Sequence, residues 1–141
     1  MMEKNHPAED SHQHTNLSDF MHELSKDDYH NHDVHHGWIT IGDLQYQKLI
    51  LESYSDSDKR RILEETIDAP RNISEIFDIC NKPQTTVYRK TMSLIKCGLL
   101  MPDDTTFKHG KKSTRYKSIF EKIRIDIIKN KISIKVKPAT R

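Results

Sequence analysis

The chain of 141 residues is 34% hydrophobic and 31% charged, which is enough for one modest core and too little for a large one. No stretch approaches the roughly 18 apolar residues of a membrane span, and the N-terminus lacks the basic and apolar regions of a secretory signal. Cys80 and Cys97 are too few for a disulfide framework and do not form a CxxC pair. We therefore expect a cytoplasmic protein without a membrane partner.

Charge is divided sharply along the chain. Residues 1–58 contain three lysines, no arginine and twelve acidic residues, a net charge of −9, whereas residues 59–141 contain twenty basic and nine acidic residues, a net charge of +11. Such asymmetry is typical of a chain with an acidic arm and a domain that meets a polyanion. A basic surface that is only solvated would give the same counts, so the motifs must decide between the two.

Residues 1–37 are rich in His, Asp, Asn, Glu and Ser and show almost no apolar periodicity. Such a segment buries too little apolar surface to offset the entropy lost on ordering. We expect a disordered acidic tail, with at most a transient helix between Leu17 and Leu24. Removal of the tail should then leave the stability of the remaining domain, residues 38–141, nearly unchanged.

Residues 43–98 predict four helices, whose starts are indicated by a polar capping residue or a proline. These signals are, in chain order, Asp43, Ser57 or Asp58, Ser74 and Pro83. Gly98 suits the left-handed residue that follows a helix end, so the last helix spans residues 83–97. Its inward stripe is predicted to contain Val87, Thr91, Leu94 and Ile95.

Beyond Gly98 the pattern changes from helical spacing to strand signals. Strand-forming residues flank Lys108–Lys112, with Gly110 at the tip, which predicts a hairpin over residues 105–117. Isoleucines alternate with charged residues on both sides of Lys129–Lys131, which predicts a second hairpin with one apolar face. The fold class is therefore α+β: a three-helix core with a preceding helix and two hairpins.

Three segments in this order carry a family resemblance. They are Asn72–Ile76, Thr85–Lys90 and Leu94–Leu100. As a set they resemble the ArsR-type and MarR-type regulators, in particular archaeal single-domain members, although each segment alone is common. The resemblance covers residues 57–120 and implies a winged helix-turn-helix fold. It also implies that the third helix of that unit enters the major groove of DNA and that the following hairpin, the wing, contacts the flanking backbone.

The predicted recognition helix, residues 83–97, has a polar side opposite Val87 and Leu94. A major groove about 12 Å wide admits one α-helix, whose polar side chains read base edges. Arg89 can pair with guanine and Gln84 with adenine, while threonines can reach a phosphate or a thymine methyl group. The predicted DNA-contacting residues of this helix are Gln84, Thr85, Thr86, Tyr88, Arg89 and Lys90.

The predicted wing, residues 105–117, adds positive charge beside this helix. Basic side chains around a glycine turn can approach phosphates and supply affinity that is independent of sequence. The predicted contacts are Lys108, Lys111, Lys112, Thr114 and Arg115. A winged helix that binds proteins of the transcription apparatus would show the same solvated faces, and it is the main alternative to a sequence-specific regulator.

Eight of the nine histidines precede Gly37. A cluster of four is spaced closely enough to hold Zn, Ni or Cu, which leaves a metal-responsive regulator open: His30, His32, His35 and His36. A flexible tail fixes no ligand geometry, so we predict neither a metal site nor another cofactor. The sequence has no P-loop, GxSxG or HExxH motif, so we expect no enzyme activity.

The predicted partners are double-stranded DNA and a second copy of the chain. The apolar face of the second hairpin exceeds what one small core can cover, which favours a homodimer or packing by the helix over residues 44–54. The members of this face are Ile123, Ile125, Ile127, Ile132, Ile134 and Val136. A dimer would present two recognition helices to half-sites about one helical turn apart.

Overall fold

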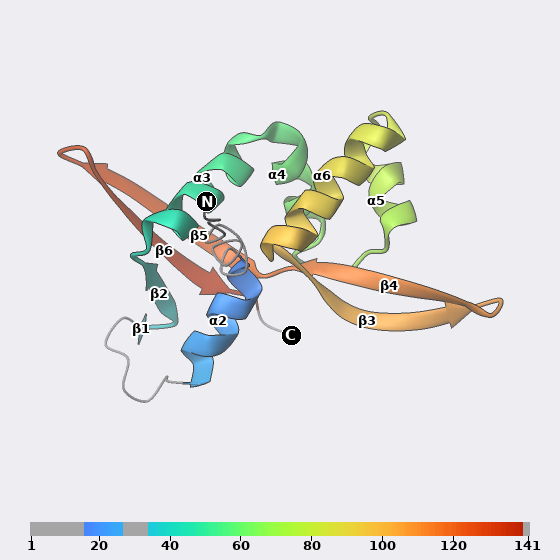
Figure 1. Ribbon diagram of the computed structural model, residues 1–141, viewed down its shortest axis with the longest axis horizontal. Coiled ribbons are helices and arrows are strands. Elements are labelled where there is room, and N and C mark those ends of the chain that lie inside the picture. Colours follow the sequence, from blue (N-terminus) through green and yellow to red (C-terminus); the bar gives the residue numbers. More distant parts are fainter. Residues whose placement is uncertain (1–15, 27–33, 140–141) are drawn as a thin grey trace, which may run out of the picture.

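The computed structural model describes residues 16–26 and 34–139. These residues form an α+β fold with two antiparallel sheets, in agreement with the predicted class (Figure 1). The helices are α2 (Leu17–Lys26), α3 (Leu44–Ser55), α4 (Ser57–Glu65), α5 (Ile73–Cys80) and α6 (Gln84–Cys97). The strands are β1 (Val34–His35), β2 (Trp38–Ile41), β3 (Leu100–Lys108), β4 (Lys111–Ser118), β5 (Phe120–Ile128) and β6 (Lys131–Pro138). None of the helices in the described ranges is long and apolar enough to span a membrane.

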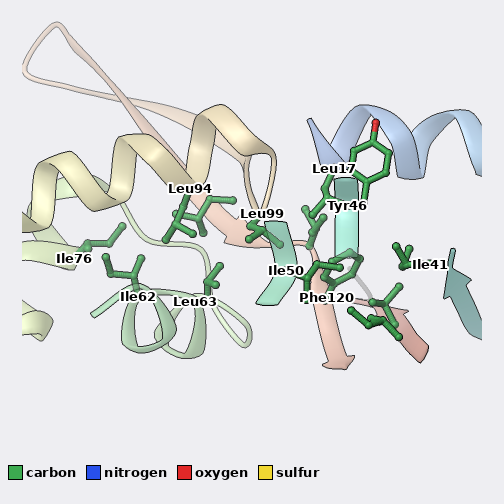
Figure 2. Close-up of a cluster of buried hydrophobic side chains, with 14 of the residues drawn as sticks. Leu17, Ile41, Tyr46, Ile50, Ile62, Leu63, Ile76, Leu94, Leu99 and Phe120 are labelled. Carbon is green, nitrogen blue, oxygen red and sulfur yellow. The ribbon is translucent and has the colours of Figure 1, made fainter. Parts of the chain in front are cut away.

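Helices α4, α5 and α6 lie against one another and form one part of the core. Val87, Thr91 and Leu94 are buried on α6, because residues three and four apart share one side of a helix. Figure 2 shows Leu94 from α6 facing Ile62 and Leu63 from α4. The predicted inward stripe of the last helix is therefore confirmed at these three positions.

The larger sheet forms the other part of the core, with the strand order β1-β2-β6-β5. Strand β2 pairs with β6, so that Ile39 lies opposite Val136 and Ile41 opposite Ile134. Ile41, Ile134 and Val136 are fully buried, in one cluster with the apolar side of α3. This pairing fixes the C-terminal hairpin to the N-terminal part of the chain and leaves β5 at the edge of the sheet.

Both predicted hairpins are present. The β3–β4 hairpin turns at His109–Gly110 and the β5–β6 hairpin turns at Lys129–Asn130, as the sequence predicts. The β3–β4 hairpin begins at Leu100, so it is longer than the predicted range 105–117, and it forms a sheet of its own. Figure 1 shows the two hairpins projecting to opposite ends of the molecule.

Two helix starts differ from those predicted. Helix α5 begins one residue before the predicted cap Ser74, because Asn72 and Glu75 form a reciprocal capping box. The N–H of Glu75 donates to Asn72 Oδ1 and the N–H of Asn72 donates to Glu75 Oε1, each at 2.9 Å. Helix α6 begins at Gln84, with Pro83 in the N-cap position rather than in the first turn. Neither shift changes which side of the helix faces the core.

The structure corrects the predicted boundary at residue 38. Leu17 of α2 is fully buried in the core, and the Phe20 and Tyr46 ring centroids lie 4.4 Å apart. Asn16 Nδ2 donates to Lys96 O at 3.1 Å, which joins the start of α2 to the end of α6. Helix α2 is therefore part of the folded unit, because its few apolar residues find partners on elements far along the chain.

Gly98 permits this close approach. Its φ of +85° is left-handed, and a Cβ at this position would lie 2.5 Å from Ser18 N, too close for any side chain.

Residues 34–37 are ordered as well, because β1 pairs with β2. The expectation of a disordered tail is wrong for these ranges. Because Leu17 is fully buried, we now expect removal of residues 1–37 to lower the stability of the remaining domain. Residues 1–15 and 27–33 lie outside the described residues.

Candidate nucleic-acid interface

Helix α6 exposes the polar side on which base contacts are predicted. Gln84, Thr85 and Arg89 are exposed and Tyr88 is 46% exposed, whereas Thr86 is half-buried. No side chain caps the start of the helix. The buried stripe on the opposite side fixes the rotation of α6 about its axis. The structure therefore brings four of the predicted residues together on one open face, and Thr86 lies at its border.

Lys90 follows Arg89 in the chain but makes different contacts. Its Nζ lies 2.8 Å from Asp58 Oδ2 and 3.0 Å from Asp56 Oδ2, and its side chain is only 20% exposed. Asp56 also caps α4, since Asp56 Oδ1 accepts hydrogen bonds from the N–H groups of Asp58 and Lys59, each at 3.0 Å. These contacts hold α6 against the start of α4. The structure therefore removes Lys90 from the set of residues that face outward.

The same contacts change the protonation equilibria of this cluster. Hydrogen bonds to Asp58 and Asp56 raise the pKa of Lys90 above its ordinary value. Burial alone would raise the pKa of Asp56, but hydrogen bonds from the Lys59 N–H and the Lys90 ammonium hold it below its ordinary value. Lys90 and Asp56 are consequently both charged at neutral pH, and the charge of Lys90 is balanced inside the protein.

Three lysines surround the tip of the β3–β4 hairpin. Lys108 lies opposite Lys111, and Phe107 lies opposite Lys112, on the two sides of the turn at His109–Gly110. All three lysines are exposed, and none of them forms an ion pair with another described residue. The tip is therefore a compact group of positive charge that can approach a phosphate.

Arg115 and Thr114, the other two predicted wing contacts, lie further from the tip. Arg115 is opposite Asp104 and binds it through two parallel hydrogen bonds, from Nε to Oδ1 at 2.8 Å and from Nη2 to Oδ2. This pairing lowers the pKa of Asp104 and raises that of Arg115. Thr114 is half-buried opposite Thr105. The charge of Arg115 is thus neutralised within the hairpin, and positive charge is concentrated at the tip.

Hydrogen bonds at the base of the β3–β4 hairpin fix it relative to the helices. The buried hydroxyl groups of Ser118 and Thr66 lie 2.8 Å apart. The Arg71 N–H donates to Tyr116 O at 3.0 Å, and the Tyr116 N–H donates to Arg71 O at 2.8 Å. The segment before α5 is therefore tied to β4, while β3 continues directly from α6. These connections hold the open face of α6 and the lysine tip in a fixed relation.

Sequence reasoning missed three exposed side chains beside this surface. Phe107 is 72% exposed near the hairpin tip, Met92 is 39% exposed on α6, and Lys96 is exposed on the same helix. Met92 and Lys96 follow Tyr88 at intervals of four residues, so helical spacing alone could have placed them on the open face. Phe107 could have been found from the hairpin register, which sets it opposite Lys112.

The histidine-rich segment adds no described site. His30 and His32 lie outside the described residues, His35 is part of β1, and His36 is exposed in the turn that follows. Across residues 16–26 and 34–139, no three His, Cys, Asp or Glu side chains are grouped so that they could hold a metal ion. The candidate interface therefore consists of α6 and the β3–β4 hairpin.

Comparison with models of known protein families finds no match, and comparison with curated proteins finds no similar sequence. The resemblance to ArsR-type and MarR-type regulators consequently remains a hypothesis that rests on the three sequence segments. The function must be argued from the side chains and their geometry.

Proposed function

We propose that the protein is a transcription regulator that binds double-stranded DNA through a winged helix-turn-helix unit. In this proposal α5 and α6 form the helix-turn-helix, α6 is the recognition helix, and the β3–β4 hairpin is the wing. The observation that carries the proposal is the open polar face of α6, followed directly in the chain by a hairpin with three exposed lysines at its tip. The order of these elements and the three family-like segments support it.

The open face of α6 has the side chains that base reading requires. Arg89 is exposed and forms no ion pair with another described residue, so its guanidinium can donate two hydrogen bonds to guanine O6 and N7. Gln84 can pair with adenine in the same groove. Thr85 lies in the first turn, where the partial positive charge of the helix end favours a phosphate. Lys90 is not included, because its charge is already balanced by Asp56 and Asp58.

The wing supplies affinity rather than specificity in this proposal. Lys108, Lys111 and Lys112 carry three positive charges at a tip that projects away from the helices (Figure 1). Phosphate contacts by such side chains release counterions from DNA, so they strengthen binding to every sequence and make it salt-dependent. Arg115 belongs to the framework of the hairpin, since it is bound to Asp104.

Arg89→Ala tests base reading, and Lys90→Met is its matched control from the adjacent position. Each variant is titrated by fluorescence anisotropy against a duplex selected from a random library and against a scrambled duplex. Arg89→Ala should lose about 1–3 kcal/mol on the selected duplex and much less on the scrambled one. Lys90→Met should keep the ratio of the two affinities. An unchanged ratio for Arg89→Ala, or a library that yields no preferred duplex, would contradict sequence-specific reading.

Lys111→Ala and Lys112→Ala test the wing, and Lys129→Ala at the tip of the other hairpin is the control. Each wing variant should weaken binding to both duplexes by similar factors. The slope of log K against log salt should fall in magnitude by about one unit for each phosphate that the variant no longer neutralises. Lys129→Ala should leave that slope unchanged. If the slope of log K against log salt in all three variants equals that of the wild type, the β3–β4 hairpin does not contact DNA.

A winged helix that binds a protein is the second candidate, and the exposed apolar side chains favour it. Phe107, Tyr88 and Met92 are 72%, 46% and 39% exposed, respectively, on or beside the same surface. Aromatic and methionine side chains of this kind are enriched in protein interfaces. If no duplex is preferred and Phe107→Ser abolishes binding to a component of the transcription apparatus, this second candidate replaces the first.

A further inference from the structure

Strand β5 is an edge strand with an exposed outer half. It is the last strand in the order β1-β2-β6-β5, and every residue from Arg124 to Ile128 is exposed. Ile127 and Ile128 are 64% and 66% exposed, and Ile125 is 38% exposed. An exposed apolar edge of this length is a template for pairing with another strand, which proteins either block or use.

The two faces of the β5–β6 hairpin differ in character. One face carries the alternating isoleucines, which are buried at the base of the hairpin and exposed towards its tip. The other face is mostly basic, with Lys122 and Arg124 on β5 opposite Lys137 and Lys135 on β6. Asp126 is the acidic residue of β5 on this face, and it forms no ion pair with another described residue.

We propose that β5 pairs antiparallel with β5 of a second copy of the chain, about a two-fold axis at Ile125. In this register Arg124 lies opposite Asp126 of the partner subunit, and Asp126 lies opposite Arg124 of the partner subunit. Ile125 meets its own copy, and Ile123 meets Ile127 of the partner subunit. The larger sheet then continues across the dimer, with opposite charges paired on one face and isoleucines on the other.

Charge selects this register from its neighbours. A shift of the two-fold axis by one residue towards Arg124 places that arginine opposite its own copy. The opposite shift places Asp126 opposite its own copy, and like charges directly opposite each other are destabilising. Only the axis at Ile125 pairs each arginine with an aspartate.

The backbone is compatible with this register, as it is with the two neighbouring ones, so charge decides among them. In a hairpin with a two-residue turn, the residues beside the turn exchange hydrogen bonds, so Ile128 directs its backbone groups to β6. Ile127, Ile125 and Ile123 then direct theirs to the free edge, where the proposed register sets them opposite one another. Arg124 and the partner's Asp126 fall at a non-hydrogen-bonded pair, in which side chains come closest.

A hollow at the base of β5 gives room for the partner's hairpin. It has a volume of about 330 Å³ and lies between α3, α4 and β5. Its lining is mainly apolar, from Tyr54, Leu63, Ile67, Phe120 and Ile123, and it also includes the charged residues Arg60, Glu64, Glu121 and Lys122. The proposed register brings Ile127 of the partner subunit opposite Ile123. That exposed isoleucine can therefore cover the apolar part of a hollow that this chain leaves open.

Arg124 already has a contact within the single chain. Its guanidinium carbon lies 5.1 Å from the centre of the Trp38 ring, and Lys137 Nζ lies 5.5 Å from the same ring. Arg124 must turn outward to meet the partner's aspartate, while Lys137 can remain over the ring. Trp38 is the single tryptophan of the chain, so its fluorescence reports this movement.

Sedimentation velocity of the full chain and its charge variants tests the proposal, without reference to DNA. The wild type should form a dimer at about micromolar concentration. Arg124→Asp and Asp126→Arg should each be monomeric, because each places like charges opposite one another twice. An equimolar mixture of these two variants should form a heterodimer, and the double variant Arg124→Asp/Asp126→Arg should again form a homodimer. Both side chains are exposed, so neither change should affect folding.

Each result of these sedimentation experiments either supports or overturns the proposed dimer. Recovery of the dimer in the mixture and in the double variant supports the register at Ile125, and a change in Trp38 fluorescence on dilution supports the movement of Arg124. A wild type that stays monomeric at about 50 µM overturns the proposal. Single variants that remain dimeric, or a mixture and a double variant that remain monomeric, overturn it as well. A failure here leaves DNA binding by a monomer unaffected, so the two proposals can fail separately.

Discussion

The two hairpins have the same kind of turn and opposite surroundings. Each turn consists of two residues with positive φ, 52° and 76° at His109–Gly110 and 51° and 66° at Lys129–Asn130. The β3–β4 hairpin is exposed or half-buried along most of its length and forms a sheet of its own. The β5–β6 hairpin buries Ile134 and Val136 completely and joins β2 in a larger sheet. The turn therefore decides that a hairpin forms, and the side chains decide where it is placed.

The difference also suggests what each exposed end can bind. The outer part of the β3–β4 hairpin is attached through hydrogen bonds at its base and carries lysines, which suit a hydrated polyanion. The outer part of the β5–β6 hairpin carries isoleucines beyond the limit of the core, which suit another protein surface. We therefore propose that the β3–β4 hairpin binds DNA and that the β5–β6 hairpin binds a second copy of the chain.

The largest effect is expected inside the β5–β6 hairpin. Ile134→Ala should lower the free energy of unfolding by about 2–5 kcal/mol, because Ile134 is fully buried and the change leaves a cavity. Ile128→Ala removes the same atoms from a side chain that is 66% exposed, and it should cost less than about 0.5 kcal/mol. Urea denaturation followed by Trp38 fluorescence, at one protein concentration, measures both. Similar losses in the two variants would mean that the hairpin is not anchored at its base as described.

The difference between the two hairpins could be predicted from the sequence because it depends on local patterns. Gly110 and Asn130 mark turns, and the isoleucines alternate on either side of the second turn. The pairing of β2 with β6 and the burial of Leu17 could not be predicted in this way. Both depend on contacts between distant parts of the chain, and the acidic composition around Leu17 outweighed its few apolar neighbours in the prediction.

The candidate interface was predictable only in part, for a similar reason. Helical spacing placed Arg89 on the open face, but it could not show that Lys90 would meet Asp56 and Asp58 more than thirty positions earlier. The pairing of Arg115 with Asp104 was accessible, since counting outward from the turn at Gly110 sets the two residues opposite each other. The charge of a residue is therefore informative about binding only after its internal partners are known.

The second largest loss of stability is expected where α4 and α6 are held together beside the β3–β4 hairpin. The stability of this half of the molecule should depend on pH. Lys90→Met should cost about 1 kcal/mol at neutral pH, because a half-buried pair of ionic hydrogen bonds is removed. The pKa of Asp56 is below its ordinary 3.8, so the stability it contributes is present above that value and is lost as pH falls through the lower, folded value. The difference between wild type and variant should therefore shrink in acid.

At alkaline pH, the stability that the ion pair contributes is lost as pH rises rather than as it falls. The pKa of Lys90 is raised above its ordinary 10.5, so its contribution is complete below that value and is lost as pH rises through the folded value. Urea denaturation of wild type and Lys90→Met at about pH 2.5, 4 and 7 measures the acid limb. A constant difference across this range would show that the ion pair does not hold α6 to α4. Ile128→Ala, in the other hairpin, should show no such dependence.

The smallest effect on stability, and the most direct comparison of the two hairpins, comes from removing one carboxylate from each. Asp104→Asn leaves Arg115 without its ionic partner at a half-buried position that water still reaches, so the free energy of unfolding should change little. The freed guanidinium adds a positive charge to the proposed wing. Binding to both selected and scrambled duplexes should therefore tighten several-fold, and the salt slope should steepen by about one unit. Asp126→Asn makes the same change of charge on the β5–β6 hairpin. Compared at protein concentrations at which wild type and variant are both monomeric, it should tighten binding to neither duplex. If both variants tighten binding equally, net charge alone explains DNA affinity, and the two hairpins do not differ in the way proposed.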